Sequence, residues 1–360
     1  MPAFAPDRLE GTSRRLLMAA GATAQEAECV AGRLVESNLM GHHSHGVIRL
    51  PQYLAAIERG EIVPGADFEI VSETAASAVL DGHWGFGQVI ATRAVGIAVE
   101  KARSTGVAAV TIRRANHIGR LGSYVEEVAG HGMIGMLFCN AHGAGVGVAP
   151  WGGRSARIAT NPIAAAVPMA TGETAAGGSP PATSRMVLDM TTSVVAEGKV
   201  RVKRNRGEPT PEGWILDAEG KPTTNPDDFY GPPRGSILPF GGSQSGYKGY
   251  GLGVVVDLLA GALSGAGTTR KPGARVGNAA LLIVVDIEQF APREEFAQSV
   301  CELADFVKSS ALMDGFEEIV LPGELEQRQM ASSSKAGVFI EDETWKQITD
   351  LEVKLRAGTN

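Results

Sequence analysis

The sequence predicts an α/β fold in which helices cover the faces of a sheet, preceded by an N-terminal helical region. From about residue 68 onward, short apolar runs with strand character alternate with helical stretches, a pattern typical of such sheets. The preceding residues show helical periodicity instead. No G-x-G-x-x-G follows a predicted strand and no G-x-x-x-x-G-K-[ST] occurs, so the sequence supports neither a standard Rossmann domain nor a P-loop domain.

The N-terminal region carries two helix signals. Thr23 and Glu26 form a T-x-x-E capping box ahead of regularly spaced apolar residues, and Gly41 can end that helix. A second helix is predicted from Pro51, a favoured first helical position, to Gly60.

The sheet is predicted from six apolar runs. They are AVLDG (78–82), VAAVTI (107–112), MIGMLF (133–138), IAAAVP (163–168), MVLDM (186–190) and ALLIVVDI (280–287), with helices near 88–104, 120–131 and 248–264. The stretch 203–235 is rich in Pro, Gly, Lys and Asp and is interpreted as a surface excursion or linker. We expect a helical region at 1–67, an α/β core at 68–323, and a C-terminal segment at 324–360 that ends in a helix after Asp342.

Composition narrows the class of protein. The chain has 360 residues, 44% hydrophobic and 20% charged, with a net charge of -7 that argues against a nucleic-acid partner. Its three cysteines are far apart and lack a C-x-x-C spacing, so a disulfide framework is not expected. The sequence shows no signal-peptide pattern and no apolar run long enough for a membrane span, and we therefore expect a cytoplasmic enzyme.

The densest group of reactive side chains is GHHSHGVIRLPQY, residues 41–53. His45, Arg49 and Tyr53 follow each other at intervals of four, which would place them on one side of a continuous helix, although Pro51 makes such a helix improbable. Histidine titrates near neutral pH, and a guanidinium grips a carboxylate through two parallel hydrogen bonds. The group therefore suits proton transfer to a substrate that is held by its carboxylate.

Two other interpretations of this segment stay open. The HHSH run could be a polar helix cap with Arg49 in a surface ion pair. Alternatively His42, His43 and His45 could ligate a metal, as in a lyase or hydrolase.

A second group is RRANHIGRLGSY, residues 113–124, which follows a predicted strand. Ligands of open α/β sheets commonly bind at this position, and the helix that follows offers free N–H groups to a phosphate. His117 is the candidate here. The alternative is a simple strand–helix turn with an exposed histidine.

Three further motifs are weaker when taken singly. Asp189 ends an apolar strand and could orient a histidine, bind a ribose, or cap a helix beginning near Thr191. GYKGYGL (246–252) places Lys248 among glycines, and LPGE (321–324) could be an anion-binding turn or an ordinary one.

In this order, the motifs resemble the malate/L-lactate dehydrogenase-like family of NAD(P)-dependent oxidoreductases, which is distinct from the Rossmann-type malate and lactate dehydrogenases. The resemblance covers nearly the whole chain, from SNLMGHHSHGV through NHIGRLGSY, ATNP, LDMTTSVVAEGK and YKGYGL to LPGE. Within the family the chain is most similar to bacterial hydroxycarboxylate dehydrogenases.

The resemblance implies a non-Rossmann α/β fold of the L-sulfolactate/malate dehydrogenase type, with a mixed sheet, flanking helices and usually a homodimer. It also implies an active site in a cleft, where a hydride passes between a nicotinamide and the carbon next to a carboxylate.

Site residues follow from the matching motif positions. Ser44, His45 and Asp189 correspond to a relay and proton donor in some members, and His117 to the acid/base in others. Arg49 and Thr160 match substrate contacts, with Tyr53 as a further one. The cofactor-contact positions are His117, Ile118, Gly119, Arg120, Leu121, Asn140, Asp189, Met190, Thr191, Lys248, Pro322, Gly323 and Glu324. No metal is implied.

Two positions depart from the family pattern. Ala159 replaces the usual glycine of G-T-N-P and is compatible only if its φ is negative. The loop FGGSQSGYKG is longer than the common form, which weakens the assignment of Lys248.

The cofactor and the substrate stay open. The cofactor could be NAD or NADP: the subgroup favours NAD, whereas a basic run could bind a 2′-phosphate or simply be solvated (Lys199, Arg201, Lys203, Arg204 and Arg206). The alternatives to a 2-hydroxy-acid dehydrogenase are a reductase of cyclic 2-imino acids and a metal-dependent lyase or hydrolase.

Overall fold

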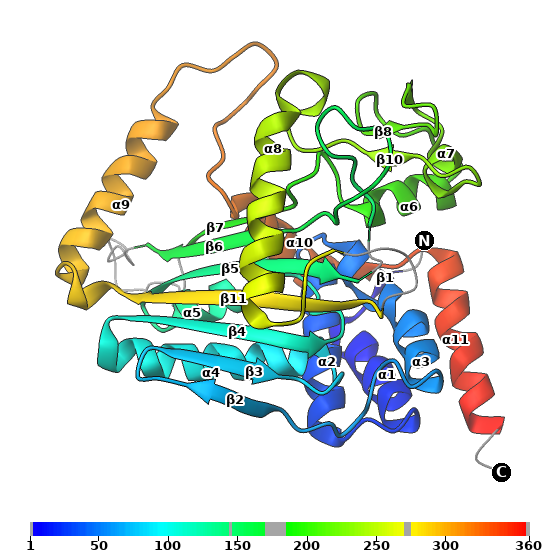
Figure 1. Ribbon diagram of the computed structural model, residues 1–360, viewed down its shortest axis with the longest axis horizontal. Helices are drawn as coiled ribbons and strands as arrows, with labels where there is room; N and C mark the ends of the chain where they lie inside the picture. The colour runs from blue at the N-terminus through cyan, green and yellow to red at the C-terminus, as the bar shows by residue number, and fades with distance from the viewer. Residues whose placement is uncertain (1–2, 144–145, 170–184, 270–274, 358–360) are drawn as a thin grey trace.

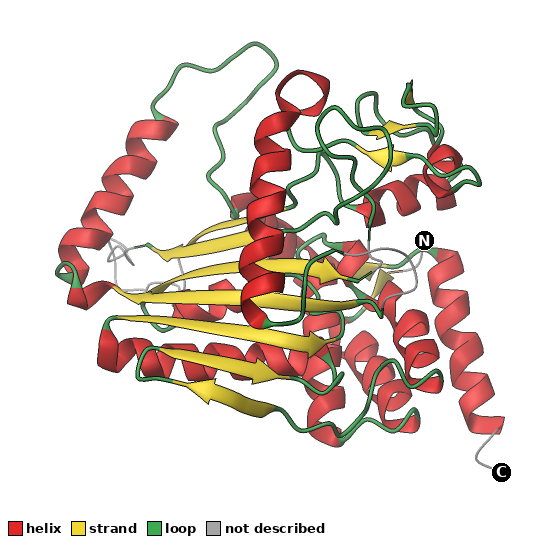
Figure 2. Ribbon diagram, viewed as in Figure 1, coloured by secondary structure: helices red, strands yellow, loops and turns green. Residues whose placement is uncertain are grey.

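The computed structural model describes residues 3–143, 146–169, 185–269 and 275–357. Its centre is a seven-stranded sheet with the order β2-β3-β4-β11-β5-β6-β7 (Figures 1 and 2). The strands are β2 (Glu69–Glu73), β3 (Ser77–Asp81), β4 (Val107–Ala115), β5 (Met133–His142), β6 (Ile163–Pro168), β7 (Arg185–Met190) and β11 (Gly277–Asp286). Only β3 and β4 pair in parallel, so the sheet is mixed, and the predicted α/β class is confirmed.

Two helices, α4 (Gly87–Thr105) and α5 (Gly122–Gly130), cover one face of the sheet (Figure 1). Along β5, buried Gly135 and Leu137 alternate with the half-buried residues that point to the other face. A Cβ on Gly135 would lie 3.0 Å from Cβ of Val128, so glycine allows α5 to approach the strand closely. The main core lies between this face and the two helices.

On the other face, α8 (Gly242–Val256) runs across the sheet and continues into a π-helical turn, η3 (Asp257–Ala262). These two elements account for the helix predicted near 248–264. The turn packs on β5 and β11 and brings Asp257 to Asn140.

The N-terminal layer contains α1 (Pro6–Ala19), α2 (Ala24–Leu39) and α3 (Leu50–Glu58). The predicted capping box is confirmed: the Glu26 amide donates to Thr23 Oγ1 at 3.2 Å, and the Thr23 amide donates to Glu26 Oε2 at 2.9 Å. Between α2 and α3 lie two short 3₁₀ turns, η1 (His43–His45) and η2 (Val47–Arg49). The HHSH segment is therefore not one continuous helix with α3.

The C-terminal part folds back onto this layer. It contains α10 (Glu324–Ala336), β12 (Val338–Phe339) and α11 (Asp342–Ala357), and β12 pairs antiparallel with β1 (Ala3–Phe4). The helix expected after Asp342 is confirmed and packs beside α1 and α3. The helix α10 lies in the segment 324–360 that was expected to be helical, whereas α9 (Arg293–Lys308) was not predicted.

Of the two interpretations of 203–235, a surface excursion or a linker, the linker is wrong. The segment folds with α6 (Glu197–Asn205) into a small unit that contains β8 (Ile215–Leu216), β9 (Pro222–Thr223), α7 (Pro226–Tyr230) and β10 (Ser236–Ile237). Its core consists of scattered apolar residues that meet only in three dimensions: Val148, Val195, Val200, Ile215, Phe229 and Ile237. Among the described residues, no helix has the length and apolar character needed to cross a bilayer.

Candidate active site

A cleft of about 180 Å³ lies where the N-terminal layer, the sheet and α6 meet. Eight of the predicted site residues line it: His45, Arg49, His117, Ile118, Gly119, Leu121, Asn140 and Thr160. It is also lined by residues that the sequence did not single out: Cys139, Ala141, Asn161, Pro162, Ala196, Glu197, Gly198 and Asn278. The two main groups of reactive side chains in the sequence therefore share one cavity.

Asn38, at the end of α2, fixes the turn that carries His45. Its Oδ1 accepts a hydrogen bond from the Val47 amide at 2.8 Å, and its Nδ2 lies 3.2 Å from Nδ1 of His43. The side chain is only 2% exposed, and a Cβ on Gly46 would lie 2.1 Å from Asn38 Oδ1. Residues 43–47 thus pack around the buried side-chain amide of Asn38. Position 46 must be glycine, because a Cβ there would overlap that amide.

Ser44, His45 and Arg49 are connected along this turn. Ser44 Oγ lies 3.1 Å from His45 Nδ1, while Arg49 donates from Nε to the Ser44 carbonyl at 2.7 Å and from Nη1 to Gln52 Oε1 at 2.7 Å. Among the described residues, Nη2 of Arg49 makes no hydrogen bond, so this amino group can donate to a bound carboxylate.

His117 lies next to His45, with the ring centroids 5.4 Å apart and the planes 15° from parallel. Its Nδ1 lies 2.7 Å from the hydroxyl of Tyr53, which also accepts a hydrogen bond from Gln88 Nε2 at 2.7 Å. Tyr53 is 2% exposed and lies behind His117 rather than along the cleft. The structure thus connects Tyr53 to the candidate acid/base, where the resemblance implied a substrate contact.

Both histidines are held in the neutral form. Burial, followed by the positive charge of Arg49, lowers the pKa of His45 to about 3. The same two causes, with His45 and Arg201 as further contributors, hold the pKa of His117 well below its usual value. At neutral pH each ring has one protonated nitrogen and one that can accept a proton.

This protonation state predicts acid sensitivity. Below pH 6.5 the unfolded chain protonates both histidines while the folded chain leaves them neutral, so the free energy of unfolding falls as the pH falls. Each histidine contributes a slope of up to about 1.4 kcal/mol per pH unit between its unfolded and folded pKa values. Urea unfolding at pH 7, 6 and 5 should show a slope smaller by about that amount in His45→Gln than in the unsubstituted protein. Equal slopes would contradict the burial of a neutral His45.

Asp189 lies elsewhere in the site. Its Oδ2 accepts a hydrogen bond from the Gly122 amide at 2.7 Å and lies 3.7 Å from Nε of the buried Arg120. Burial raises the pKa of Asp189, although Arg120 opposes that effect. Neither Ser44 nor His45 is hydrogen-bonded to it in the part of the chain that the structure describes. Asp189 holds the first turn of α5 and does not cap a helix at Thr191, since the next helix is α6.

The predicted cofactor segments are partly brought together. The loop 117–121 meets Asp189–Thr191 through the Gly122 contact, and the Pro322 carbonyl accepts a hydrogen bond from the Val187 amide at 2.9 Å. Gly323 has φ of 91°, and a Cβ there would lie 3.0 Å from that of Val187. Lys248, by contrast, is exposed on α8, with Nζ 5.9 Å from the ring centroid of Tyr247, and does not line the cleft.

Two buried amides in the cleft present unused acceptors. Asn140 donates from Nδ2 to Asp257 at 2.7 Å, and Asn161 donates from Nδ2 to the Gly253 carbonyl at 2.9 Å. The Oδ1 atoms of both have no hydrogen-bond partner within the described residues. Buried acceptors of this kind fit a ligand with N–H donors, such as the carboxamide of a nicotinamide.

Asn161 was missed although its ATNP motif was recognised, because only Thr160 was assigned a role. Its φ of 32° is left-handed, a strained backbone conformation that is frequent at functional sites. Ala159, two residues earlier, is not among the described residues with positive φ, so this departure from glycine is accommodated.

A family model described as malate/L-lactate dehydrogenase matches residues 4–349. The chain belongs to the malate/L-lactate dehydrogenase family. L-sulfolactate dehydrogenase of Methanocaldococcus jannaschii is 37% identical over 92% of this chain and 91% of its own length. Hydroxycarboxylate dehydrogenase B of Escherichia coli is 35% identical over 92% and 88% of the two chains. The solved structure of sulfolactate dehydrogenase from M. jannaschii matches with a TM-score of 0.84 and 34% identity over 98% and 97%.

The resemblance found in the sequence and the predicted fold type are thereby confirmed. The family includes 2-hydroxycarboxylate dehydrogenases and is typically NAD(P)-dependent. Relatives named for sulfolactate, malate and lactate match about equally well, so the matches establish the family and the reaction type rather than one substrate.

The histidines of the HHSH run have separate partners in this family member. His42 Nε2 lies 3.4 Å from Glu326 Oε1, His43 contacts Asn38, and His45 contacts Ser44. The three rings therefore do not converge on one point, and no group of three or more potential metal ligands occurs in the described ranges.

Most of the basic run on and after α6 is already paired with acidic side chains. The ion pairs are Arg201–Glu197, Lys203–Glu208, Arg204–Asp227 and Arg206–Glu341. This arrangement favours the interpretation of the run as a solvated, ion-paired surface over the binding of a 2′-phosphate.

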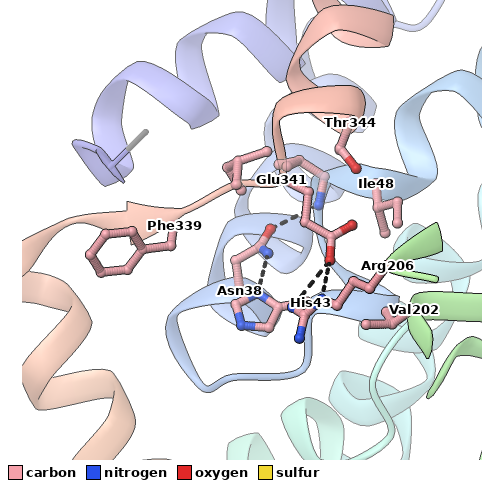
Figure 3. A pocket seen from close by; sticks show the side chains of 10 residues that line it. Asn38, His43, Ile48, Val202, Arg206, Phe339, Glu341 and Thr344 are labelled. Atoms are coloured by element: carbon pink, nitrogen blue, oxygen red, sulfur yellow. Dashed lines mark hydrogen bonds and ion pairs between the residues drawn. The ribbon is translucent and has the colours of Figure 1, made fainter. Parts of the chain in front are cut away.

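A second pocket of about 80 Å³ lies behind the HHSH turn (Figure 3). Its walls come from the turn, from α6 and from the segment between β12 and α11. Arg206 donates from Nε to Glu341 Oε1 at 3.2 Å, and the two side chains face each other beside His43 in Figure 3. The end of α6 is thus tied to the C-terminal segment close to the turn that carries His45.

Proposed function

We propose that the protein is an NAD(P)-dependent dehydrogenase that interconverts a 2-oxo acid and the corresponding 2-hydroxy acid. The observation that carries the proposal is the presence of a guanidinium with an unused amino group and a pair of stacked imidazoles in one small cleft. A 2-oxo acid needs a cation for its carboxylate and a proton-exchanging group at its carbonyl oxygen. Arg49 supplies the first, and His117 or His45 supplies the second.

Substrate binding changes the electrostatics of this pair. A carboxylate placed at Arg49 offsets the positive charge that, after burial, contributes most to lowering the pKa of both histidines. The bound carboxylate therefore opposes the lowering of the pKa of both histidines by Arg49, although burial continues to lower it. A neutral imidazole can then accept the proton released by a 2-hydroxy acid, and an imidazolium can return it in the reverse reaction.

The cofactor would be held by the loop 117–121 and by Asn140 and Asn161, whose free acceptors suit its carboxamide. When bound, the nicotinamide supplies the hydride for reduction of the oxo acid and accepts it in the reverse direction. The resemblance favours NAD, and the ion-paired state of the basic run is compatible with that preference.

The test is oxidation of NADH and NADPH at 340 nm in the presence of a chelator. The panel contains pyruvate, oxaloacetate, phenylpyruvate, hydroxyphenylpyruvate, piperideine-2-carboxylate and pyrroline-2-carboxylate. We expect turnover of at least one oxo acid and independence of metal. Turnover of the cyclic imines alone would instead identify an imino-acid reductase, and activity lost to the chelator would revive the metal-dependent alternative.

We further propose that the protein is a homodimer. The segment around and after α9, which extends beyond the sheet in Figure 1, exposes large apolar side chains: Phe290, Leu303, Phe306, Met313 and Phe316. Monomeric proteins rarely expose apolar groups so densely, and a second copy of the chain supplies a matching apolar surface by symmetry.

Light scattering should give twice the 37.5 kDa of one chain. Phe306→Glu should weaken the dimer by about 10-fold or more, since a charge would be buried at the interface. Val353→Glu, an equally exposed apolar position on α11, is the matched control and should stay dimeric. A monomeric unsubstituted protein would contradict the proposal.

A further inference from the structure

Gln88 is a buried polar residue that no step of the reaction described above uses. It is the second residue of α4 and only 1% exposed, yet its amide reaches Tyr53, which lies 35 positions earlier in the chain. A Cβ on Gly87 would lie 2.1 Å from the Asn116 carbonyl oxygen, so the first turn of α4 is in direct contact with the backbone that carries His117. The position of Gln88 relative to His117 is therefore fixed by packing.

The three side chains form one hydrogen-bonded chain, Gln88–Tyr53–His117. The amino group of Gln88 donates to the Tyr53 oxygen, and the single Tyr53 proton has one acceptor within reach among the described residues, Nδ1 of His117. Nδ1 is then an acceptor, and the proton of the neutral imidazole lies on Nε2. In this state His117 can donate a hydrogen bond to a substrate oxygen but cannot accept a proton at Nε2.

To accept the proton of a 2-hydroxy acid, His117 must present an unprotonated Nε2 and carry its own proton on Nδ1. Nδ1–H then donates to the Tyr53 oxygen, and the Tyr53 hydroxyl needs a new acceptor. Gln88 can supply one, because rotation of its amide by about 180° presents the carbonyl in place of the amino group. Neither Tyr53 nor Gln88 gains or loses a proton in this change.

We propose that Gln88 is a positioning residue that acts through Tyr53 to set which nitrogen of His117 carries the proton. By turning its amide, Gln88 lets His117 pass from the resting tautomer, which only donates a hydrogen bond from Nε2, to the tautomer whose Nε2 accepts the proton of the hydroxy acid. The imidazolium formed in this way returns the same proton in the reverse reaction. The inference rests on the proposed function, because it assumes that His117 exchanges the proton of the substrate.

Gln88→Met and Gln88→Glu are expected to shift the pH dependence in opposite directions. Methionine has nearly the same length as glutamine but offers the Tyr53 hydroxyl no acceptor. The imidazolium of His117 is therefore disfavoured, and the apparent pKa that the plot of kcat/KM against pH gives for His117 falls. An ionised glutamate offers the Tyr53 hydroxyl only acceptors, so the apparent pKa of His117 rises in Gln88→Glu. We expect the change in apparent pKa to be about one pH unit in each variant. We also expect kcat to fall by about 10-fold in Gln88→Met with little change in KM.

The other titratable and charged groups that face His117 are unchanged in these variants. They are His45, Arg49 and Arg201, from η1, η2 and α6. Thr92→Val removes a partly buried hydroxyl from the next turn of α4, which contacts Cys29 and Arg33 instead, and should behave as the unsubstituted enzyme.

Two further measurements keep the inference testable if one variant is poorly folded. The ¹⁵N shifts of His117 should report a proton on Nε2 in the free enzyme. In a Tyr53→Phe background, Gln88→Met should have no additional effect on the pH profile, because the chain is already broken. If the apparent pKa of His117 shifts in the same direction in Gln88→Met and Gln88→Glu, or does not shift in either, the role of Gln88 is overturned. If the unsubstituted enzyme is inactive on every oxo acid, the proposed function is overturned instead.

Discussion

Replacement of His117 by alanine is expected to lower kcat by about 10²–10⁴-fold, the usual contribution of a positioned acid/base. His117 is favoured over His45 because two buried side chains, Tyr53 and Gln88, support it from behind. Within the described ranges, the His45 ring has Ser44 as its one hydrogen-bond partner. KM should change far less, since Arg49 remains in place to hold the carboxylate. Steady-state kinetics with the best oxo acid of the panel would measure both constants.

His131→Ala is the matched control, because this histidine is exposed on the far side of α5. His45→Ala decides between the two candidates. If it abolishes turnover while His117→Ala does not, the proton is exchanged at the Ser44–His45 pair. Full activity in both variants would contradict the proton-exchange role altogether.

Loss of Arg49 is expected to reduce kcat/KM by about 10²–10³-fold. Truncating one partner of a buried, hydrogen-bonded charge pair costs about 2–5 kcal/mol, and the bound carboxylate would lose its partner in this way. Arg49→Met tests the contribution of the positive charge. Arg49→Lys keeps the charge and tests the paired hydrogen bonds of the planar guanidinium, which a lysine cannot form. The apparent pKa of the histidines in the plot of kcat/KM against pH should also rise in Arg49→Met, because a nearby positive charge that lowers their pKa is removed.

Arg59→Met provides the control for this experiment. It removes an exposed guanidinium, ion-paired with Glu61, from the residue that follows α3, whereas Arg49 directly precedes that helix. An Arg49→Met enzyme with intact kcat/KM would show that the substrate carboxylate binds elsewhere.

Local signals in the sequence predicted the regular elements well. The capping box of α2, the proline at the start of α3 and the apolar runs of six strands each depend on neighbouring residues, and each is found in the structure. The position of β11 between β4 and β5 could not be predicted, because it depends on pairing with strands more than 130 residues earlier in the chain.

The candidate site shows the same division between local and distant information. Residue chemistry singled out His45, Arg49 and His117, and all three line the cleft. The spacing of Tyr53 placed it beside Arg49, but the 3₁₀ turns break that geometry, and its partners prove to be Gln88 and His117. Gln88 belongs to the run FGQ (86–88), which is part of the resemblance to bacterial hydroxycarboxylate dehydrogenases, but it was given no role. Its residue type offers no reason for one, since an isolated glutamine near a helix start is common on protein surfaces.

The pairing of β1 with β12 has a consequence for synthesis on the ribosome. The helical layer that carries His45 is completed by residues 338–357, which emerge about 300 residues after α2. At the usual rates of translation, this interval is on the order of 15–60 s. During it, the apolar faces of α1 and α2 lack the cover that Val338, Ile340 and Ile348 later provide. The nascent chain therefore has a long interval in which a chaperone can bind the exposed apolar faces of these helices, before residues 338–357 cover them.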